Sequence, residues 1–290
     1  MHPAPSVIIF TTLSGLGFGL LAFLGLGIPD VTGNTAFAFF ALAYAMAAGG
    51  LLASTFHLGN KKNAIYAFSQ WRTSWLSREG IAAVATLVIF GPVAIGRVFF
   101  DSDMALIGVI GSVFALLTVF TTSMIYAQLK TIPRWYQPIV PVMFLLHAIA
   151  GGALFAGASK LAGVLLLLLV GVMVWMWREG DRREADGADT MESATGLGAI
   201  GKVRMYESAH TARNYVMDEM IHRVGRKHAQ KLRNIAILLI GALPAVMLLI
   251  LPAGHFVSAL AIILHLAGIA IGRWLFFAEA RHVVGLYYGK

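Results

Sequence analysis

Long apolar segments make up most of this chain, and their lengths restrict the folds it can adopt. An α-helix needs about 20 apolar residues to cross the hydrocarbon core of a membrane. Runs of about this length cover Ser6–Ile28, Ala36–Phe56, Ile81–Phe100, Met104–Ala127, Ile139–Ala158, Leu161–Trp177, Ile235–Leu251 and Phe256–Phe277. The pattern predicts an all-α, polytopic membrane protein with eight transmembrane helices, in which residues 1–290 form a single integral-membrane domain. A tight turn is expected at Ser159–Lys160.

The composition supports this interpretation and excludes several kinds of site. Only 12% of the residues are charged and 58% are hydrophobic, whereas soluble proteins carry about a quarter charged residues. The chain has no cysteine, so it cannot form disulfides, thiolate metal sites or cysteine-held iron–sulfur clusters. We predict no metal site in this chain, and nothing in the sequence indicates nucleic-acid binding.

The basic residues predict the orientation in the membrane. With eight spans, both termini lie on one side, together with the loops after spans two, four and six. All but three of the 22 Lys and Arg residues fall on that side, the exceptions being Arg97, Lys160 and Arg273. Cytoplasmic loops carry an excess of Lys and Arg, so both termini are predicted to be cytoplasmic.

Two glycine pairs indicate close helix packing. Gly15 and Gly19, and likewise Gly268 and Gly272, stand four residues apart on one helix face. Small residues at this spacing let helix backbones approach closely. Packing within the bundle is favoured over a homodimer interface.

The first cytoplasmic connection is rich in polar and aromatic residues. Ile65, Phe68 and Trp71 share one face of a possible short helix in the plane of the lipid headgroups. His57 follows span two, and Glu79 comes just before span three. If these spans pack as an antiparallel pair, the two side chains can approach each other at the membrane surface.

An imidazole and a carboxyl group at the mouth of an apolar crevice, beside Arg78, could bind and deprotonate a quinol. Quinone chemistry moves two protons with two electrons and therefore needs such proton-accepting groups. A plain ion pair of Arg78 with Glu79 or with a neighbouring helix is the other interpretation. Arg273, near the end of the last span, could face the same crevice or form a helix-packing ion pair.

The loop from Arg178 to Arg233 is the longest connection. Its first part is polar and glycine-rich, which predicts irregular structure. Further on, apolar residues recur at helical spacing between charges, which predicts either a surface helix on the membrane or, as we favour, a helix that docks a soluble partner. These residues are Met217, Met220, Ile221, Val224 and His228.

Two histidines lie inside the predicted spans. His147 and His265 could be the axial ligands of a b-type haem, or they could be packing histidines with hydrogen-bonded rings, which is the favoured interpretation. A secondary transporter is a further alternative, but the sequence shows neither an inverted repeat nor paired broken helices.

Several segments together resemble a known family. Four parts of the chain are similar to the membrane-anchor subunit of the dimethyl sulfoxide reductase family (DmsC type). They are HPAPSVIIFTTLSGLGFG, STFHLG with RTSWLSREG, SATGLGAIGKVRMYESAHTARNY and RWLFFAEARHVVGLYYG. The resemblance covers nearly the whole chain. Its start and the ATGLG…GKVRM block look most similar to anchors of cytoplasmic sulfite-oxidising molybdoenzymes.

The resemblance implies a function that the composition does not show. A molybdopterin catalytic subunit would exchange electrons through a four-cluster ferredoxin-like iron–sulfur subunit with a quinone, ubiquinone or menaquinone, bound by this anchor in the bacterial inner membrane. No haem or iron–sulfur cluster is expected in this chain. His57 and Glu79 match the family's quinol-site histidine and glutamate, whereas Arg78, Arg72 and Arg273 are added from their position alone. Sulfite oxidation with quinone reduction is favoured, and dimethyl sulfoxide-type reduction with quinol oxidation is next.

Overall fold

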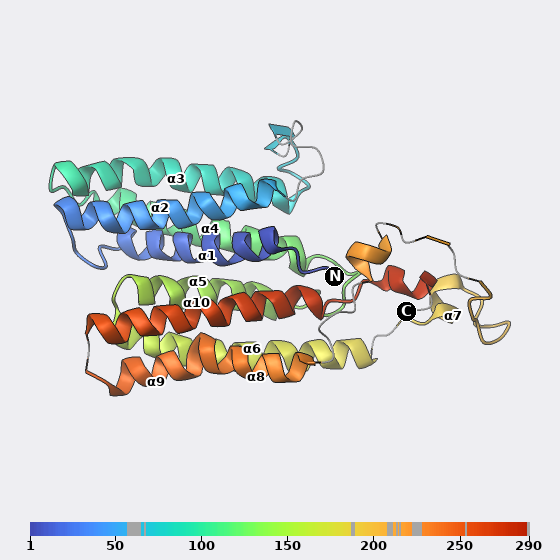
Figure 1. Ribbon diagram of the computed structural model, residues 1–290. Coiled ribbons are helices and arrows are strands. Elements are labelled where there is room, and N and C mark those ends of the chain that lie inside the picture. The colour runs from blue at the N-terminus through green and yellow to red at the C-terminus, as the bar shows by residue number, and fades with distance from the viewer. Residues whose placement is uncertain are drawn as a thin grey trace.

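A computed structural model describes residues 1–56, 65–66, 68–186, 189–207, 211–212, 214, 216–221, 228–252 and 254–288. Within these ranges every regular element is a helix, and no strand occurs. The helices lie side by side as long rods, and both termini lie at the same end of the bundle (Figure 1). His57 lies outside the described residues.

The rods correspond to the apolar runs of the sequence. They are α1 (Pro5–Gly25), α2 (Gly33–Thr55), α3 (Trp75–Phe99), α4 (Ala105–Ala127), α5 (Ile139–Phe155), α6 (Ser159–Asp186), the continuous pair α8 (Ala229–Ile237) and α9 (Leu243–Ile250), and α10 (His255–Ala278). In the described part of the chain, seven rods are long and apolar enough to cross a membrane, and α5 is shorter, with 17 residues. The all-helical, multi-pass architecture is confirmed. The count of eight spans and the cytoplasmic side of the termini stay predictions.

Helix α1 is the central element of the first half of the bundle, where it packs on α2, α4 and α5. Gly19 allows this, because a Cβ atom there would overlap the carbonyl group of Ala148 on α5. Gly268 on α10 likewise packs against the backbone at Ile240. Both glycines have the packing role within the bundle that their spacing predicts. Gly15 differs, since a Cβ atom there would meet open space.

Helices α5 and α6 are joined by a short turn, as predicted, but the turn comes slightly earlier in the chain. It occupies residues 156–158, with Gly157 at a φ of +76°, and Ser159 and Lys160 are already the first residues of α6. A left-handed φ is readily adopted only by glycine, so Gly157 fixes where the chain reverses. At the same end of the bundle, Arg97 on α3 pairs with Asp30.

At the other end, α6 and α8 both extend beyond the predicted spans. Helix α6 continues to Asp186 instead of stopping at Trp177, and α8 begins at Ala229 rather than at Ile235. Charged side chains from distant segments pair with these extensions. Arg134, in the connection before α5, lies 2.6 Å from Asp181 and 2.8 Å from Glu184.

A second arginine completes this ion-pair cluster. Arg233 on α8 lies 2.7 Å from Asp181 and 2.7 Å from Glu279, the residue that caps α10. The cluster of Arg134, Asp181, Glu184, Arg233 and Glu279 therefore joins four segments of the chain at the end that carries both termini. Ionic side chains can hold helices in register beyond the apolar spans.

The long loop contains short elements beyond this cluster. They are α7 (Met191–Thr195) and a π-helical turn, η2 (Val216–Met220), which lies near a 3-10 segment, η5 (Val283–Tyr288). Met217 and Met220 belong to η2, whose Glu219 carbonyl accepts a hydrogen bond from the backbone N–H of His2. Val224 lies outside the described residues, and partner docking by a helix here stays a prediction. In the first loop, residues 65–66 and 68 have 3-10 geometry, and Ile65, Phe68 and Trp71 are exposed.

Candidate functional site

Glu79 is a carboxylate buried within the bundle. Helix α3 begins at Trp75, where the Ser74 hydroxyl accepts a hydrogen bond from the backbone N–H of Ser77. Glu79 follows in the second turn and is only 4% exposed. Its Oε1 accepts a hydrogen bond of 2.5 Å from the Thr122 hydroxyl on α4. A buried ionisable group in a membrane helix is expensive and is therefore a functional candidate.

Arg78 is the preceding residue along the chain but points elsewhere. Its Nε donates to the carbonyl oxygen of Trp71 at 2.9 Å, and its Nη2 donates to that of Arg72 at 2.7 Å. The guanidinium also lies 4.3 Å from the centre of the Trp75 ring. Arg78 therefore fastens the end of the first loop over the start of α3. The alternative expectation of an ion pair with Glu79 is wrong, because the guanidinium is occupied by these backbone carbonyls.

The other predicted residues fall into two environments. The side chain of Arg72 is exposed at the surface beside Trp71. Arg273, on α10, is 4% exposed and its guanidinium lies 3.9 Å above the centre of the Phe144 ring. The predicted approach of His57 to Glu79 stays a prediction, because His57 lies outside the described part of the chain. Helix α2 ends at Thr55, at the same end of the bundle where α3 begins.

Arg273 is a buried cation with an unusual set of neighbours. Among the residues that the structure describes, none brings a carboxylate within ion-pair distance of it. Its Nη1 lies 3.9 Å from the Met143 sulfur, and its Nε has no hydrogen-bond partner in the described chain. An aromatic face attracts a cation but does not neutralise it. The packing ion pair considered from the sequence is therefore absent from this part of the chain.

Two small cavities adjoin Arg273. Each has a volume of about 10 Å³, close to the smallest space that holds one water molecule. Both are lined by Thr11, Gly15 and Arg273. The first also touches Thr122, the partner of Glu79, and the second touches His147. A buried polar region therefore leads from Glu79 through Thr122 to Arg273, beside the part of α1 between Thr11 and Phe18.

Comparison with known proteins agrees with the resemblance stated above. The DMSO reductase anchor subunit (DmsC) family matches residues 1–289. The chain belongs to this family of anchor subunits. A sulfite dehydrogenase subunit of Allochromatium vinosum is 31% identical over an alignment of 322 residues that covers 99% of each chain. No solved structure matches the chain.

The two intramembrane histidines of this anchor subunit have structural partners. His147 Nδ1 donates to the carbonyl oxygen of Met143 at 2.9 Å, and His265 Nδ1 donates to that of Ile240 at 2.6 Å. A Cβ atom at Gly151 of α5 would lie 3.3 Å from His265 Nε2, so the helix backbone abuts that imidazole. The cavity beside His147 has a volume of about 10 Å³, and the absence of a haem from this chain stays a prediction.

Tyr126 is a site residue that the sequence reasoning missed. It stands one helical turn after Thr122 on α4 and is buried. Its ring stacks on Phe144 at a centroid distance of 5.7 Å, and Phe144 also carries the Arg273 guanidinium. Tyr126 and Arg273 therefore both pack against the Phe144 ring. The sequence shows that Tyr126 and Thr122 are four residues apart on one helix face, but no local signal indicates that this face of α4 packs against Glu79.

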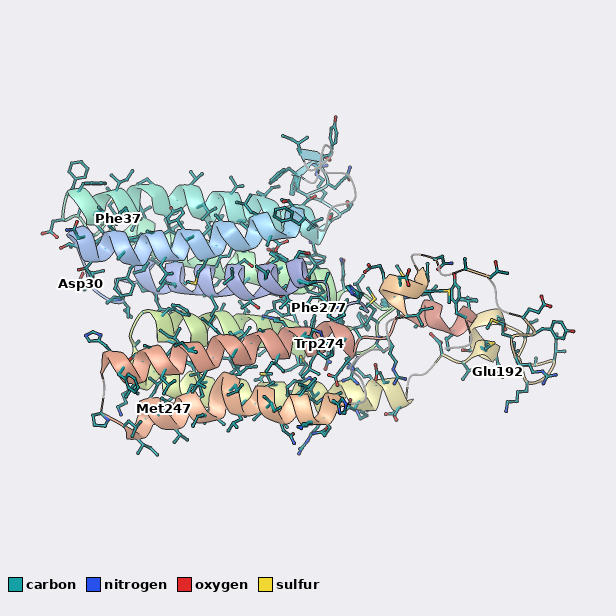
Figure 2. All side chains as sticks on the ribbon, in the orientation of Figure 1. Asp30, Phe37, Glu192, Met247, Trp274 and Phe277 are labelled. Carbon is teal, nitrogen blue, oxygen red and sulfur yellow. The ribbon has the colours of Figure 1, made fainter. Side chains whose placement is uncertain are left out.

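Aromatic rings enclose this region towards the end of the bundle that bears the termini. Trp135, Phe276 and Phe277 each contact the Tyr126 ring edge-on. Trp135 donates its indole N–H to the carbonyl oxygen of Phe276 at 2.9 Å. Figure 2 places Phe277 and Trp274 at this end of the bundle, and Asp30 and Phe37 at the other. The polar region therefore lies just inside the end from which the long loop extends.

Proposed function

We propose that this anchor subunit binds a quinone at the Glu79 region and passes electrons between it and a soluble iron–sulfur partner. The buried Glu79 carboxylate, joined to Thr122 inside a membrane helix, carries the proposal. Such a group is costly in an apolar bundle, and a reaction that needs a proton at that depth accounts for its presence.

The chemistry assigns roles to the residues of this region. Reduction of a quinone consumes two electrons and two protons, and oxidation of a quinol releases them. Glu79 would hold or deliver one of these protons, and His57 would serve the other, because both are general acids and bases that work near neutral pH in suitable surroundings. Arg78 would keep the loop in place over α3. Arg273 would stabilise negative charge on a quinone oxygen from the inner side, and Arg72 would act at the headgroup surface.

Partners and location follow from the anchor role. The family is that of an anchor subunit in a multi-subunit oxidoreductase, so catalytic and electron-transfer subunits accompany it. We propose a four-cluster ferredoxin-like subunit next to the anchor and a molybdopterin subunit beyond it, both on the cytoplasmic side of a bacterial inner membrane. The name of the Allochromatium relative favours sulfite as the electron donor, and we propose a quinone as the acceptor. The anchor itself would hold neither haem nor iron–sulfur cluster.

The test uses the whole purified complex with two electron acceptors. Sulfite-dependent reduction of a short-chain ubiquinone or menaquinone analogue reports the complete path, and reduction of ferricyanide reports the soluble subunits alone. Glu79→Gln is expected to lower the quinone rate by about 100-fold or more, the size of a lost general acid or base, and to leave the ferricyanide rate unchanged. Asp30→Asn, at the opposite end of the bundle, is the matched control.

If Glu79→Gln kept the full quinone rate, the assignment of the site would be wrong. If the unaltered complex reduced neither the quinone nor ferricyanide with sulfite, the same variants would be compared in quinol-driven dimethyl sulfoxide reduction. His57→Ala is expected to resemble Glu79→Gln in whichever assay runs.

A further inference from the structure

One segment extends well beyond the helical bundle on the side of the two termini. It follows the end of α6 and contains α7 and the residues up to Glu207 (Figure 1). Glu192, at its base, is separated from the ends of the long helices in Figure 2. We call residues 189–207 the projecting segment. It lies outside every rod that is long enough to cross a membrane.

The projecting segment is held in a defined shape by hydrogen bonds. At the start of α7, the Thr190 hydroxyl accepts from the backbone N–H of Ser193, and the Ser193 hydroxyl accepts from that of Thr190. This reciprocal capping box fixes the first turn of a helix. Helix α7 ends at Thr195 and is capped by Gly196, whose φ of +70° suits glycine and reverses the chain.

Two further bonds tie the segment together and fasten it to the rest of the chain. The Glu192 carboxylate accepts a hydrogen bond of 3.0 Å from the backbone N–H of Val203. Hydrogen bonds to its own backbone N–H and to that of Val203 hold the pKa of Glu192 below its ordinary value. The Tyr287 hydroxyl in η5 donates to the carbonyl oxygen of Ala194 at 3.0 Å. The segment is therefore ordered before any partner binds, which reduces the entropy cost of binding.

The surface of this segment is apolar at its most exposed points. Tyr206 is 93% exposed and Ile200 is 85% exposed, and the large apolar side chains of Leu197 and Met205 are also exposed. Single exposed apolar residues are common on proteins. Four of them within ten residues, on a fixed segment beyond the helical bundle, form a patch of the kind that marks an interaction site. Lys202 and Arg204 lie among them in sequence and are exposed too.

We propose that the projecting segment docks the soluble electron-transfer subunit of the complex. Ile200 and Tyr206 would fill apolar depressions on that subunit, and Lys202 and Arg204 would face its acidic side chains. The family supports this occupant, since an anchor subunit has to hold a soluble subunit outside the membrane. Aromatic side chains and arginine are enriched in such interfaces. The iron–sulfur nature of the partner rests on the proposed function, whereas the need for a soluble partner rests on the family.

Substitution of the exposed residues tests the docking in the complete complex. Ile200→Asp and Tyr206→Asp are expected to lower co-purification of the soluble subunits by about tenfold or more each, the effect of losing an interface anchor. The yield and melting temperature of the anchor subunit measure whether the variants still fold. Lys202→Glu should weaken binding as well, whereas Glu207→Lys, a matched charge change of opposite sign in the same segment, should leave it intact or strengthen it.

Photo-crosslinking identifies the partner directly. A benzophenone amino acid at position 200 or 206 is expected to form a covalent product with the electron-transfer subunit, and one at Phe37, on the lipid-facing surface at the other end, is not. Crosslinks only to lipid, to a second copy of the anchor or to another soluble subunit would overturn the assignment, as would full co-purification of both Asp variants. A failure of the quinone proposal is distinguishable from a failure of the docking proposal. In the first case Glu79→Gln would give an intact complex with an unchanged quinone rate.

Discussion

The His265 imidazole donates a hydrogen bond from Nδ1 to the carbonyl oxygen of Ile240 at 2.6 Å. Ile240 precedes Pro244 by four residues, and proline has no backbone N–H with which to continue the helical ladder. The carbonyl of Ile240 would otherwise lack its usual i+4 donor, and a π-helical segment (Leu238–Ala242) lies at the same place. His265 therefore has a structural reason to be inside the membrane that does not involve a cofactor.

A double-mutant cycle checks this relationship. His265→Ala leaves the Ile240 carbonyl unsatisfied, so we expect a loss of about 1–3 kcal/mol in stability. Pro244→Ala restores a backbone N–H at the right position, and His265→Ala should cost less in that background. Melting temperatures of the detergent-solubilised protein, measured for the four variants, give the coupling. Equal losses in both backgrounds would show that the histidine does not compensate for the proline.

The Thr122 hydroxyl is expected to matter through Glu79. Thr122→Val keeps the shape of the side chain but removes the donor at 2.5 Å from the carboxylate, so the quinone rate should fall by about tenfold or more, with the ferricyanide rate unchanged. Thr122→Ser keeps a hydroxyl and should retain most of the rate. Thr86→Val, which removes a buried hydroxyl bonded to Thr118 on the same pair of helices, is the control. A similar loss in that control would indicate a packing effect.

The rods are predictable from the sequence because the membrane imposes a length and a composition on each of them. The ends of α4 agree with the predicted boundaries to within one residue. The extension of α6 to Asp186 is not predictable, since it depends on Arg134 and Arg233, which lie about 50 residues before and after their partner Asp181. Local composition around residue 180 is polar and gives no sign of those two partners.

In the candidate site too, single residues are predictable from the local sequence, whereas their contacts with distant residues are not. Glu79 stands out from its surroundings, because a carboxyl group at the start of an apolar run is rare. Its contact with Thr122 joins residues 43 apart and depends on how α3 packs on α4. The sequence marks Arg273 as a charge within a span, but its position over Phe144 and beside Thr11 comes only from the fold. Tyr126 was missed for the same reason.

Arg273 offers a test in which stability and function are expected to change in opposite directions. The desolvation cost of a buried charge is not offset when the charge has no carboxylate partner, and an apolar side chain of similar volume removes that cost. Arg273→Met should therefore raise the melting temperature, while the quinone rate falls and the ferricyanide rate is kept. Arg97→Met, which breaks the ion pair with Asp30, should not raise it. A stabilised variant with a full quinone rate would remove Arg273 from the proposed site.

Arg233 provides a prediction that depends on pH. Burial raises the pKa of Glu279, and the Arg233 guanidinium opposes that rise. Arg233→Met should therefore raise the pKa of Glu279 further. A carboxyl group whose folded pKa lies above its unfolded value stabilises the fold fully below the unfolded pKa and loses that contribution as the pH rises through the folded pKa.

The Arg233→Met variant should accordingly be least stable at alkaline pH. There it leaves a buried, unpaired carboxylate, and the expected loss is about 3–5 kcal/mol. Melting curves of the detergent-solubilised protein between about pH 5 and pH 8 should show a deficit that grows with pH, since an ordinary glutamate titrates near 4.3. Arg233→Met combined with Glu279→Gln should lose that pH dependence, because position 279 then carries no titrating carboxyl group and Asp181 keeps its pair with Arg134. A deficit independent of pH in both variants would mean that Arg233 acts through its pair with Asp181 or its packing on Trp177 instead of through Glu279.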